Sequence, residues 1–291
     1  MKKQDAYKLL AAFMILIMII VPVAYVMTSP RSDINQETQN PSSGQEKYNP
    51  DLWVINQPFY SISDALNMTP VGAISASYAD LESMTPQMVQ WTKSVLPVNE
   101  VDSLYKSNTT KMYYATLPSP KEGVPNFLLL STMFPEKNDF DYIVLPNTTN
   151  ILRRQDTGAI NILGNPIIYT VNDKTTVDVL TIINSLNKTN TSYDKYQGLL
   201  SNVDEAPFQE INSNVTFADQ FYMGVKETSG NYERTTVYLN ANSSTLKKLN
   251  QLKTGSTQKG FAQYSIIRNG NYTVVKIGGP DMFTVLSEES S

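Results

Sequence analysis

The sequence predicts an α+β protein with an N-terminal transmembrane helix, a flexible stalk and two tandem ferredoxin-like sandwich units whose sheets are mainly antiparallel. Three observations lead to this prediction. A long apolar run stands near the N-terminus, a polar stretch follows it, and the rest of the chain repeats a similar order of strand and helix patterns. The chain has 291 residues, 41% of them hydrophobic, which is enough for the core of one large domain or two average ones.

The apolar run extends from Leu9 to Met27 and holds nineteen residues without a charge. As a helix it would be about 28 Å long, which is close to the hydrocarbon thickness of a bilayer. A cleaved signal peptide is the alternative interpretation. Its apolar region is usually only about 7–15 residues long, and a small-residue cleavage site is missing here, so we expect a retained anchor.

The charges around this run predict its direction. Three lysines and one aspartate precede it, whereas acidic and basic residues balance soon after it. The positive-inside rule therefore places residues 1–8 in the cytoplasm and residues 28–291 outside. The exported part then carries 20 basic and 26 acidic residues. An acidic balance of this kind argues against a general nucleic-acid binder.

Residues 28–50 are expected to form a flexible linker. Ile34 and Tyr48 are its only large apolar side chains. Such a segment cannot bury enough surface to offset its ordering entropy, so we expect a stalk that separates the folded part from the membrane.

The first α+β unit is predicted over residues 51–150. It begins with an apolar strand pattern at residues 71–78, followed by a helix that starts at Thr85 and Pro86, an N-cap and a first-turn proline. One face of this helix holds Met88, Trp91 and Val95. Further strand patterns cover residues 112–117, 126–131 and 141–145.

The second unit is predicted over residues 151–286, followed by a polar tail, residues 287–291. Its strand patterns cover residues 166–171, 220–225 and 234–239. A helix from about Thr176 presents Val179, Leu180, Ile183 and Leu186. A second helix is expected to be capped by Ser244, and a hairpin over residues 264–277 turns at Asn269-Gly270.

This order of strands and helices is that of a ferredoxin-like unit, although the first copy lacks a clear second helix. Each apolar helix face should be buried against its own sheet. Truncating Ile183 to Ala is therefore expected to cost about 2–5 kcal/mol.

The composition excludes much of catalytic and metal chemistry. The chain has no Cys and no His, so zinc–thiolate sites, Ser-His-Asp triads and thiolate nucleophiles are impossible. Any catalysis would depend on carboxylates, Lys, Tyr or a Ser/Lys pair. No cofactor, no metal site and no catalytic residue is predicted.

Three short charged motifs remain as weak candidates for a site. Asp139-Phe140-Asp141 resembles a DxD metal pair, but with no third carboxylate nearby we interpret it as a solvated entry to a strand. Arg153-Arg154 could pair with a carboxylate or with a partner. Asp204-Glu205 is interpreted as a solvated acidic step in a loop.

Eight N-x-S/T sequons lie in the part predicted to be outside, whereas about five would arise by chance in this composition. They begin at Asn67, Asn108, Asn147, Asn187, Asn190, Asn214, Asn242 and Asn271. We expect some of them to carry glycans, because most fall in predicted turns; the alternative is a polar surface without sugar. Asn242 and Asn271 are predicted at exposed turns, so exchanging either for Gln should cost little.

Several of these features together resemble the signal-anchored, N-glycosylated envelope proteins of methanogenic archaea, a largely uncharacterised group. They are the opening MKKQDAYKLLAAFMILIMIIVPVAYV, the Asn/Thr-rich sequon-bearing ectodomain, the missing Cys and the acidic balance. The resemblance implies an envelope location and glycosylation, and it transfers no site residues.

The predicted function is that of a non-enzymatic, membrane-tethered extracytoplasmic protein that binds a partner at the cell envelope or has a structural role there. Its partners would be the membrane, through one helix, and another envelope protein or an exported chain; no nucleic acid is expected. The alternative is an assembly factor or enzyme acting on exported polypeptides or glycans. The sequence does not predict the oligomeric state.

Overall fold

The computed structural model describes residues 50–119, 121–146, 148, 150–185 and 190–288. Leu9–Met27, the cytoplasmic residues 1–8, the stalk up to residue 49 and the end of the polar tail lie outside these described residues. No helix within the described part has the length and apolar character that a bilayer crossing requires.

The described chain up to residue 170 contains mostly strands. In order, its elements are η1 (Pro50–Leu52), β1 (Trp53–Asn56), α2 (Ile62–Leu66), β2 (Ser75–Asp80), η2 (Leu81–Ser83), α3 (Pro86–Val95), α4 (Val98–Tyr105), β3 (Asn108–Thr116), β4 (Phe127–Phe134), β5 (Tyr142–Val144), β6 (Leu152–Arg154), β7 (Ile160–Asn165) and β8 (Ile167–Thr170).

Two helices lead from β8 into the rest of the chain. The elements there are α5 (Asp173–Asn184), α6 (Tyr193–Leu200), β9 (Phe208–Asn212), β10 (Gln220–Thr228), β11 (Asn231–Leu239), α7 (Ser243–Thr254), η3 (Thr257–Lys259), β12 (Gln263–Asn269), β13 (Tyr272–Gly279) and α8 (Met282–Ser287).

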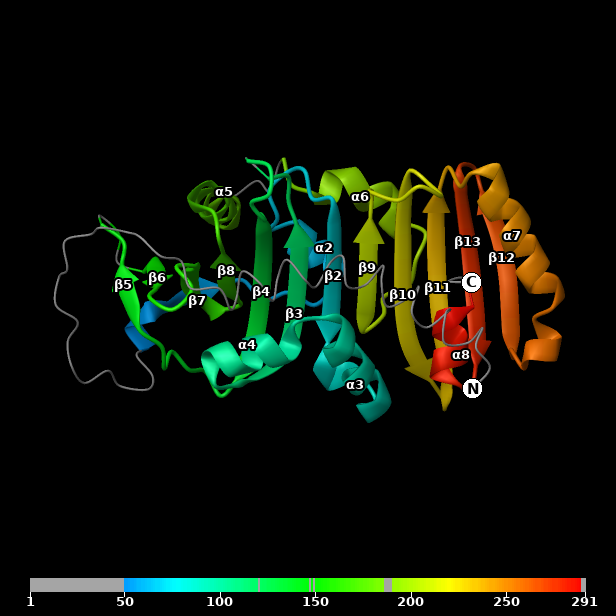
Figure 1. Cartoon of the computed structure of the whole chain (residues 1–291), viewed down its shortest axis with the longest axis horizontal. Coiled ribbons are helices and arrows are strands. Elements are labelled where there is room, and N and C mark those ends of the chain that lie inside the picture. The colour runs from blue at the N-terminus through cyan, green and yellow to red at the C-terminus, as the bar shows by residue number, and fades with distance from the viewer. Residues whose placement is uncertain (1–49, 120, 147, 149, 186–189, 289–291) are drawn as a thin grey trace.

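The thirteen strands form one large sheet (Figure 1). The strand order from edge to edge is β12-β13-β11-β10-β9-β2-β3-β4-β8-β7-β6-β5, and β1 pairs in parallel with β7. The other pairings are antiparallel. The predicted α+β class with mainly antiparallel strands is therefore confirmed.

The two halves of this sheet share a strand order. On one side β2, β3 and β4 are consecutive neighbours, β8 pairs with β4, and β7 pairs with β8. On the other side β9, β10 and β11 are neighbours, β13 pairs with β11, and β12 pairs with β13. The halves meet where β2 pairs with β9, with Ser75 opposite Asn212 and Ala79 opposite Phe208.

The prediction of two tandem ferredoxin-like units is wrong. β2 and β9 join the halves through a continuous ladder, so neither half closes a sheet of its own. Strands within residues 151–170, which the sequence assigns to the second unit, lie on the β4 side of the sheet. The two halves have the same strand order, but their helices are inserted at different places. α3 and α4 separate β2 from β3, whereas only residues 213–219 separate β9 from β10.

Helices cover both faces of the sheet. One apolar cluster contains side chains of α3, α4 and α8, and a second contains side chains of α2, α5 and α6. In Figure 1, α5 and α6 lie near the upper ends of the strands, whereas α3, α4 and α8 lie near the lower ends. A third cluster packs Leu249 of α7 and Val285 of α8 against β11, β12 and β13.

The predicted helix faces are confirmed in the first half and shifted in the second. Met88 and Val95 are buried, and the ring of Trp91 lies 4.5 Å from that of Phe208. On α5, Val179 and Ile182 are the buried apolar residues. Leu180 and Ile183 are half-buried at the margin of the core, and Leu186 lies outside the described residues. A large penalty is therefore expected at Val179 or Ile182 rather than at Ile183.

Local signals at helix ends and turns were mostly informative. Thr85 caps α3 by accepting a hydrogen bond from the Met88 N–H, with Pro86 in the first turn, as predicted. The predicted hairpin is present, but its two-residue turn is Gly270-Asn271 rather than Asn269-Gly270, because Asn269 still pairs with Tyr272; Gly270 has φ +58°. The predicted cap of α7 is wrong: Asn242, not Ser244, accepts the hydrogen bond from the Thr245 N–H.

Candidate functional site

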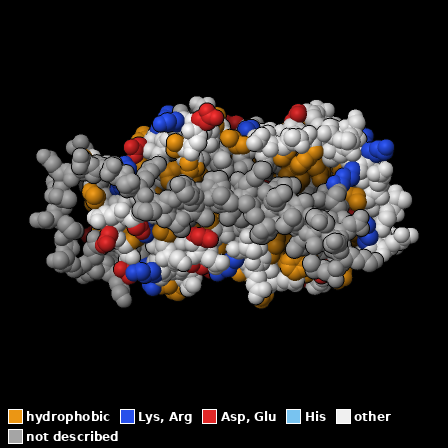
Figure 2. Space-filling view, viewed as in Figure 1, with side chains coloured by type: hydrophobic (Ala, Val, Ile, Leu, Met, Phe, Trp, Pro, Cys, Tyr) orange, Lys and Arg blue, Asp and Glu red, His pale blue; other side chains and the backbone are white. Residues whose placement is uncertain are grey.

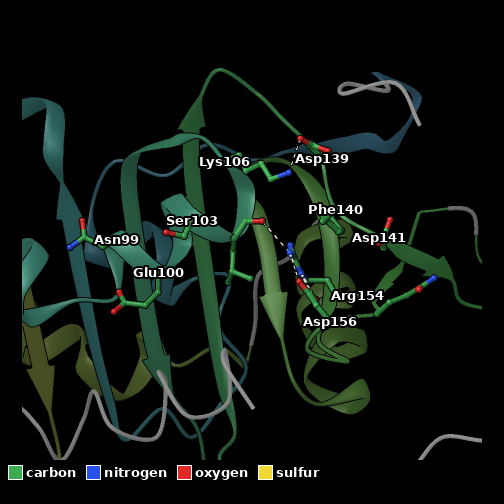
Figure 3. Close-up of a pocket in the computed structure, with 11 residues that line it drawn as sticks. Asn99, Glu100, Ser103, Lys106, Asp139, Phe140, Asp141, Arg154 and Asp156 are labelled. Atoms are coloured by element: carbon green, nitrogen blue, oxygen red, sulfur yellow. Dashed lines mark hydrogen bonds and ion pairs between the residues drawn. The ribbon is translucent and has the colours of Figure 1, made fainter. Parts of the chain in front are cut away.

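An open cavity of about 930 Å³ lies among the segments that connect the strands in the half of the sheet with β2, β3 and β4. Its walls come from α4, from the segment between β4 and β5, and from the end of β6 with the turn that follows (Figure 3). Asn99, Glu100 and Ser103 lie at neighbouring positions on α4, because helical residues three or four apart share a face. The cavity is therefore formed by segments that are inserted between successive strands of the sheet.

Arg154 forms the base of the cavity and is 2% exposed. Its Nε and Nη2 donate to the two carboxylate oxygens of Asp156 at 3.0 and 2.8 Å, and Nη2 also donates to the carbonyl oxygen of Leu104 at 3.1 Å. The guanidinium lies 4.0 Å from the centre of the Phe140 ring. Arg154 thus holds together all three segments that form the walls.

The electrostatics of this pair keep both groups charged. Burial alone would lower the pKa of Arg154, but the hydrogen bonds and negative charge of Asp156 outweigh it and raise that pKa. Partial burial alone would raise the pKa of Asp156, but the hydrogen bonds from Arg154 and Thr157 and the charge of Arg154 lower it. Nη1 of Arg154 is buried and has no hydrogen-bond partner among the described residues.

Tyr105 fixes α4 behind the cavity. Its hydroxyl donates to the side-chain oxygen of Asn161 on β7, and its ring packs edge-on against Phe140 at 5.7 Å. Burial raises the pKa of Tyr105, so the phenol stays protonated. The wall formed by α4 is therefore tied to the sheet and to the segment opposite.

Lys106 and Asp139 close one rim of the cavity. Lys106 ends α4 in the left-handed conformation with φ +51°, and its Nζ lies 3.0 Å from the carboxylate of Asp139. Both side chains are more than a third exposed, so this pair contributes little to stability. It does place one more opposite-charge pair at the cavity mouth.

The cavity has more negative than positive groups. Four carboxylates, those of Glu100, Asp139, Asp141 and Asp156, face two cations, those of Lys106 and Arg154. Both cations are already paired, with Asp139 and Asp156. The described part of the chain gives Glu100 and Asp141 no ion-pair partner. In Figure 3 these two carboxylates lie on opposite sides of the Arg154–Asp156 pair.

The structure brings two of the sequence motifs together. Asp139-Phe140-Asp141 and Arg154 line the same cavity, although each was weak alone. Arg153 points elsewhere and pairs with Asp173 at 3.0 Å. Sequence reasoning missed the α4 residues and Asp156, because no local pattern shows that α4 lies beside β6. Among the described residues, no group of three or more acidic side chains is placed to hold a metal ion.

The third motif, Asp204-Glu205, forms an ion pair with a lysine from a distant part of the chain. Lys276 on β13 pairs with Asp204 at 2.9 Å, and its hydrogen bond and charge lower the pKa of Asp204. Asp204 is 66% exposed, which agrees with the prediction of a solvated step in a loop.

The sequons differ in accessibility. Asn147 and Asn187 lie outside the described residues. The side chains of Asn108, Asn190, Asn214, Asn242 and Asn271 are exposed. Asn67 is half-buried at the end of α2, its side-chain nitrogen donates to the Ser63 carbonyl at 3.1 Å, and Thr69 of the same sequon is fully buried. Asn67 is therefore a poor acceptor in the folded protein.

A Ser/Lys pair lies on the other face of the molecule. Nζ of Lys195 donates to Oγ of Ser213 at 2.7 Å and to the Ala73 carbonyl at 2.9 Å. The Tyr196 hydroxyl lies 3.0 Å from the same Oγ, and Ser213 in turn donates to the Ile74 carbonyl at 2.9 Å. Partial burial lowers the pKa of Lys195. These bonds fasten α6 to the ends of β2 and β9.

The surface charges are mixed. On the face shown in Figure 2, the acidic and basic side chains of the described residues are interspersed, with no broad basic field. Both signs meet at the lower left of that view, over the region where Figure 1 places α4 and the segment leading to β5.

Comparison with family models and with curated proteins gives no match. Among solved structures, the fold is distantly similar to TP0453, a membrane-associated protein of Treponema. One crystal form of TP0453 gives a TM-score of 0.43 at 11% identity and covers 78% of this chain and 98% of that chain. Another gives 0.42 at 10% identity, with 76% and 97% covered. Likeness at this level carries no argument about function.

Proposed function

We propose that this chain is a membrane-tethered extracytoplasmic protein of the cell envelope that acts by binding a partner rather than by catalysis. The apolar run Leu9–Met27, the lysines before it and the exposed sequons after it support the location. The resemblance of the opening segment and ectodomain to archaeal envelope proteins supports it too.

The observation that carries the binding role is the cavity between α4 and the β5–β6 hairpin. Its volume of about 930 Å³ is in the range of ligand sites. Its walls are fixed by the buried Arg154 and Tyr105, so the site exists before a partner arrives. Its free carboxylates, Glu100 and Asp141, are groups that a partner can engage without breaking an existing ion pair.

Cross-linking from the cavity tests this role. The chain has no native Cys, so Ser103→Cys introduces a unique thiol at the cavity, and Ser201→Cys at the end of α6 is the matched control. A thiol-directed photo-cross-linker in native membranes should join one stoichiometric envelope partner to the Ser103→Cys variant and not to the Ser201→Cys variant. Equal products from both variants, or none from either, would contradict the proposal.

A second candidate is an enzyme or assembly factor that acts on exported polypeptides or glycans. The contact between Ser213 and Lys195 favours it, because a neutral lysine can activate a serine hydroxyl. However, the Ser213 hydroxyl and the Lys195 amine both donate to backbone carbonyls, as in a structural clamp.

Labelling with a fluorophosphonate probe discriminates between the two candidates. Binding without catalysis predicts no labelling of Ser213. Labelling that is lost in both Ser213→Ala and Lys195→Arg, while the protein stays folded, would support the enzyme. Cross-linking of many unrelated exported chains, instead of one partner, would support the assembly factor.

A further inference from the structure

The cavity offers a ligand two kinds of group at fixed positions, carboxylates and an aromatic ring. Glu100 and Asp141 are carboxylates without a cation among the described residues. Phe140, 7% exposed, lines the same space and already stacks on a guanidinium.

The charges exclude a simple anion as the natural occupant. Four carboxylates against two cations leave an excess of two negative charges in the cavity. A free carboxylate or phosphate in the cavity would meet the charges of Asp156, Asp139 and Asp141, which line it together with Arg154. Like charges at this range repel each other, so the ligand must be positive where it meets Glu100 and Asp141.

The positions of the free carboxylates add a second requirement. Nη1 of Arg154 is buried and the guanidinium stacks on Phe140, so a ligand in the cavity meets the carboxylates rather than this N–H. Glu100 and Asp141 stand on different segments, so the ligand must carry at least two cations in one molecule. A polypeptide meets this need, since several Lys or Arg side chains can follow one another along one chain.

The placement of the carboxylates favours an extended segment. Glu100 lies on α4 and Asp141 precedes β5, so the two stand on opposite sides of the Arg154–Asp156 pair (Figure 3). A chain crossing between them would pass over Arg154. Successive side chains of an extended segment point in opposite directions, so alternate residues could reach the two walls.

We infer that the cavity binds a Lys- or Arg-rich extended segment of an envelope or exported polypeptide. The inference rests on the proposed function and specifies the chemistry of its partner. The segment's basic side chains pair with Glu100 and Asp141.

The test uses the full-length protein in nanodiscs and a fluorescent, N-acetylated and C-amidated hexalysine peptide, with hexaglutamine as the neutral reference. Anisotropy titrations should show that hexalysine binds and hexaglutamine does not, with affinity falling as salt rises. The double variant Glu100→Gln/Asp141→Asn should weaken binding severalfold, and by no more than about twenty-five-fold, since each exposed ion pair is worth up to about fivefold.

Glu122→Gln provides the matched control. Glu122 is exposed in the connection between β3 and β4, at the opposite end of β3 from Lys106, and its exchange removes a negative charge of the same kind away from the cavity. Affinity for hexalysine should then change by less than twofold. An equal loss in both variants would show attraction to net charge alone and overturn the inference.

Other outcomes separate this inference from the proposed function. The inference of a basic polypeptide ligand is overturned if the double variant binds hexalysine unchanged. It is also overturned if a glucosamine hexamer binds more tightly than hexalysine, or if calcium binds, loses its binding in the double variant, and hexalysine does not bind at all. If the Ser103→Cys variant still captures a single partner in membranes, the proposed function survives each of these results. Loss of that capture removes the proposed function itself.

Discussion

The two halves of the sheet have the same strand order but different connections. In the half that contains β2, β3 and β4, the connections carry α3 and α4 after the first strand and the β5–β6 hairpin after the third. In the half that contains β9, β10 and β11, the first connection is a short loop and α7 follows the third strand. The cavity of about 930 Å³ lies entirely among the connections of the first half.

This difference indicates that the sheet is a common scaffold and that the candidate site is a property of the inserted segments. Loops and connections tolerate change while the strands keep the core, so new sites usually arise there. Variants in both halves can show whether the scaffold is shared and whether the site belongs to one half alone.

The largest effect is expected from a core truncation in the second half. Ile277→Ala on β13 removes a fully buried side chain and should cost about 2–5 kcal/mol. Both tryptophans, Trp53 and Trp91, lie in the first half. Because β2 and β9 join the halves, tryptophan fluorescence and far-UV circular dichroism should report one shared, shifted unfolding transition.

The exposed Ile267 on the adjacent strand β12 is the matched control, and Ile267→Ala should change stability by less than about 0.5 kcal/mol. If Ile277→Ala leaves the fluorescence transition in place while the dichroism signal moves, the halves unfold separately. Two independent units would then be the better description.

The next effect contrasts ion pairs of the two halves. Arg154→Met removes a buried guanidinium and its bonds to Asp156 and Leu104, and should cost about 2–4 kcal/mol in chemical denaturation. Lys226→Met, in the half-exposed Lys226–Glu233 pair at 3.3 Å, should cost less than about 1 kcal/mol. Similar values for both would mean that Arg154 does not hold the cavity walls.

The Arg154–Asp156 pair also predicts a pH dependence. The folded pKa of Asp156 is lowered, so its stabilisation is present above the ordinary carboxyl pKa and is lost as pH falls through the folded value. The difference in stability between wild type and Arg154→Met should therefore shrink on acidification.

A smaller effect is expected at the seam between the halves. Glu210 on β9 lies opposite Ser77 and Met223, with no cation of the described residues beside it, and burial raises its pKa to about 7. The raised pKa means that stability is greatest below the ordinary value of 4.5 and is lost as pH rises through 7.

Glu210→Gln mimics the protonated form. It should stabilise the protein by about 1–2 kcal/mol at pH 8 and by almost nothing at pH 4, as measured by urea denaturation at both values. A destabilised variant at pH 8 would show that the charged carboxylate has a partner that the fold does not reveal.

The smallest effect on stability is expected at Asn242 in the second half, where the sequence alone predicts almost no cost. Asn242 caps α7, so Asn242→Gln should cost about 1 kcal/mol in the unglycosylated protein rather than almost nothing. Asn271→Gln, at an exposed position in the β12–β13 turn, should be close to neutral. Equal thermal midpoints for the two variants would show that the cap does not contribute.

Local features were predictable because their causes are local. The cap at Thr85, the apolar face of α3 and the β12–β13 hairpin each depend on residues a few positions apart, although the hairpin turn is one residue later than predicted. β9 escaped prediction because Phe208–Asn212 is short and mixes polar with apolar residues. Its pairing with β2, which decides between one sheet and two units, joins residues far apart in the sequence.

The cavity was predictable only in pieces. The acidic triplet at Asp139 and the arginine pair at Arg153 stand out in the sequence, but their meaning depends on a contact between Arg154 and Leu104, fifty residues apart. Glu100 looks like any polar residue on a helix. No local pattern could show that it would face Asp141 across an ion pair.

The labelling rate of single cysteines by a membrane-impermeant maleimide on intact cells tests the topology and the binding site together. Under the proposed topology Ser201→Cys should be labelled rapidly, because Ser201 is exposed at the end of α6, away from the cavity. Ser103→Cys should be labelled slowly on cells and rapidly on the purified protein, because the proposed partner would cover the cavity. Labelling of neither cysteine before lysis would contradict the topology, and equal rates at both on cells would contradict the binding site.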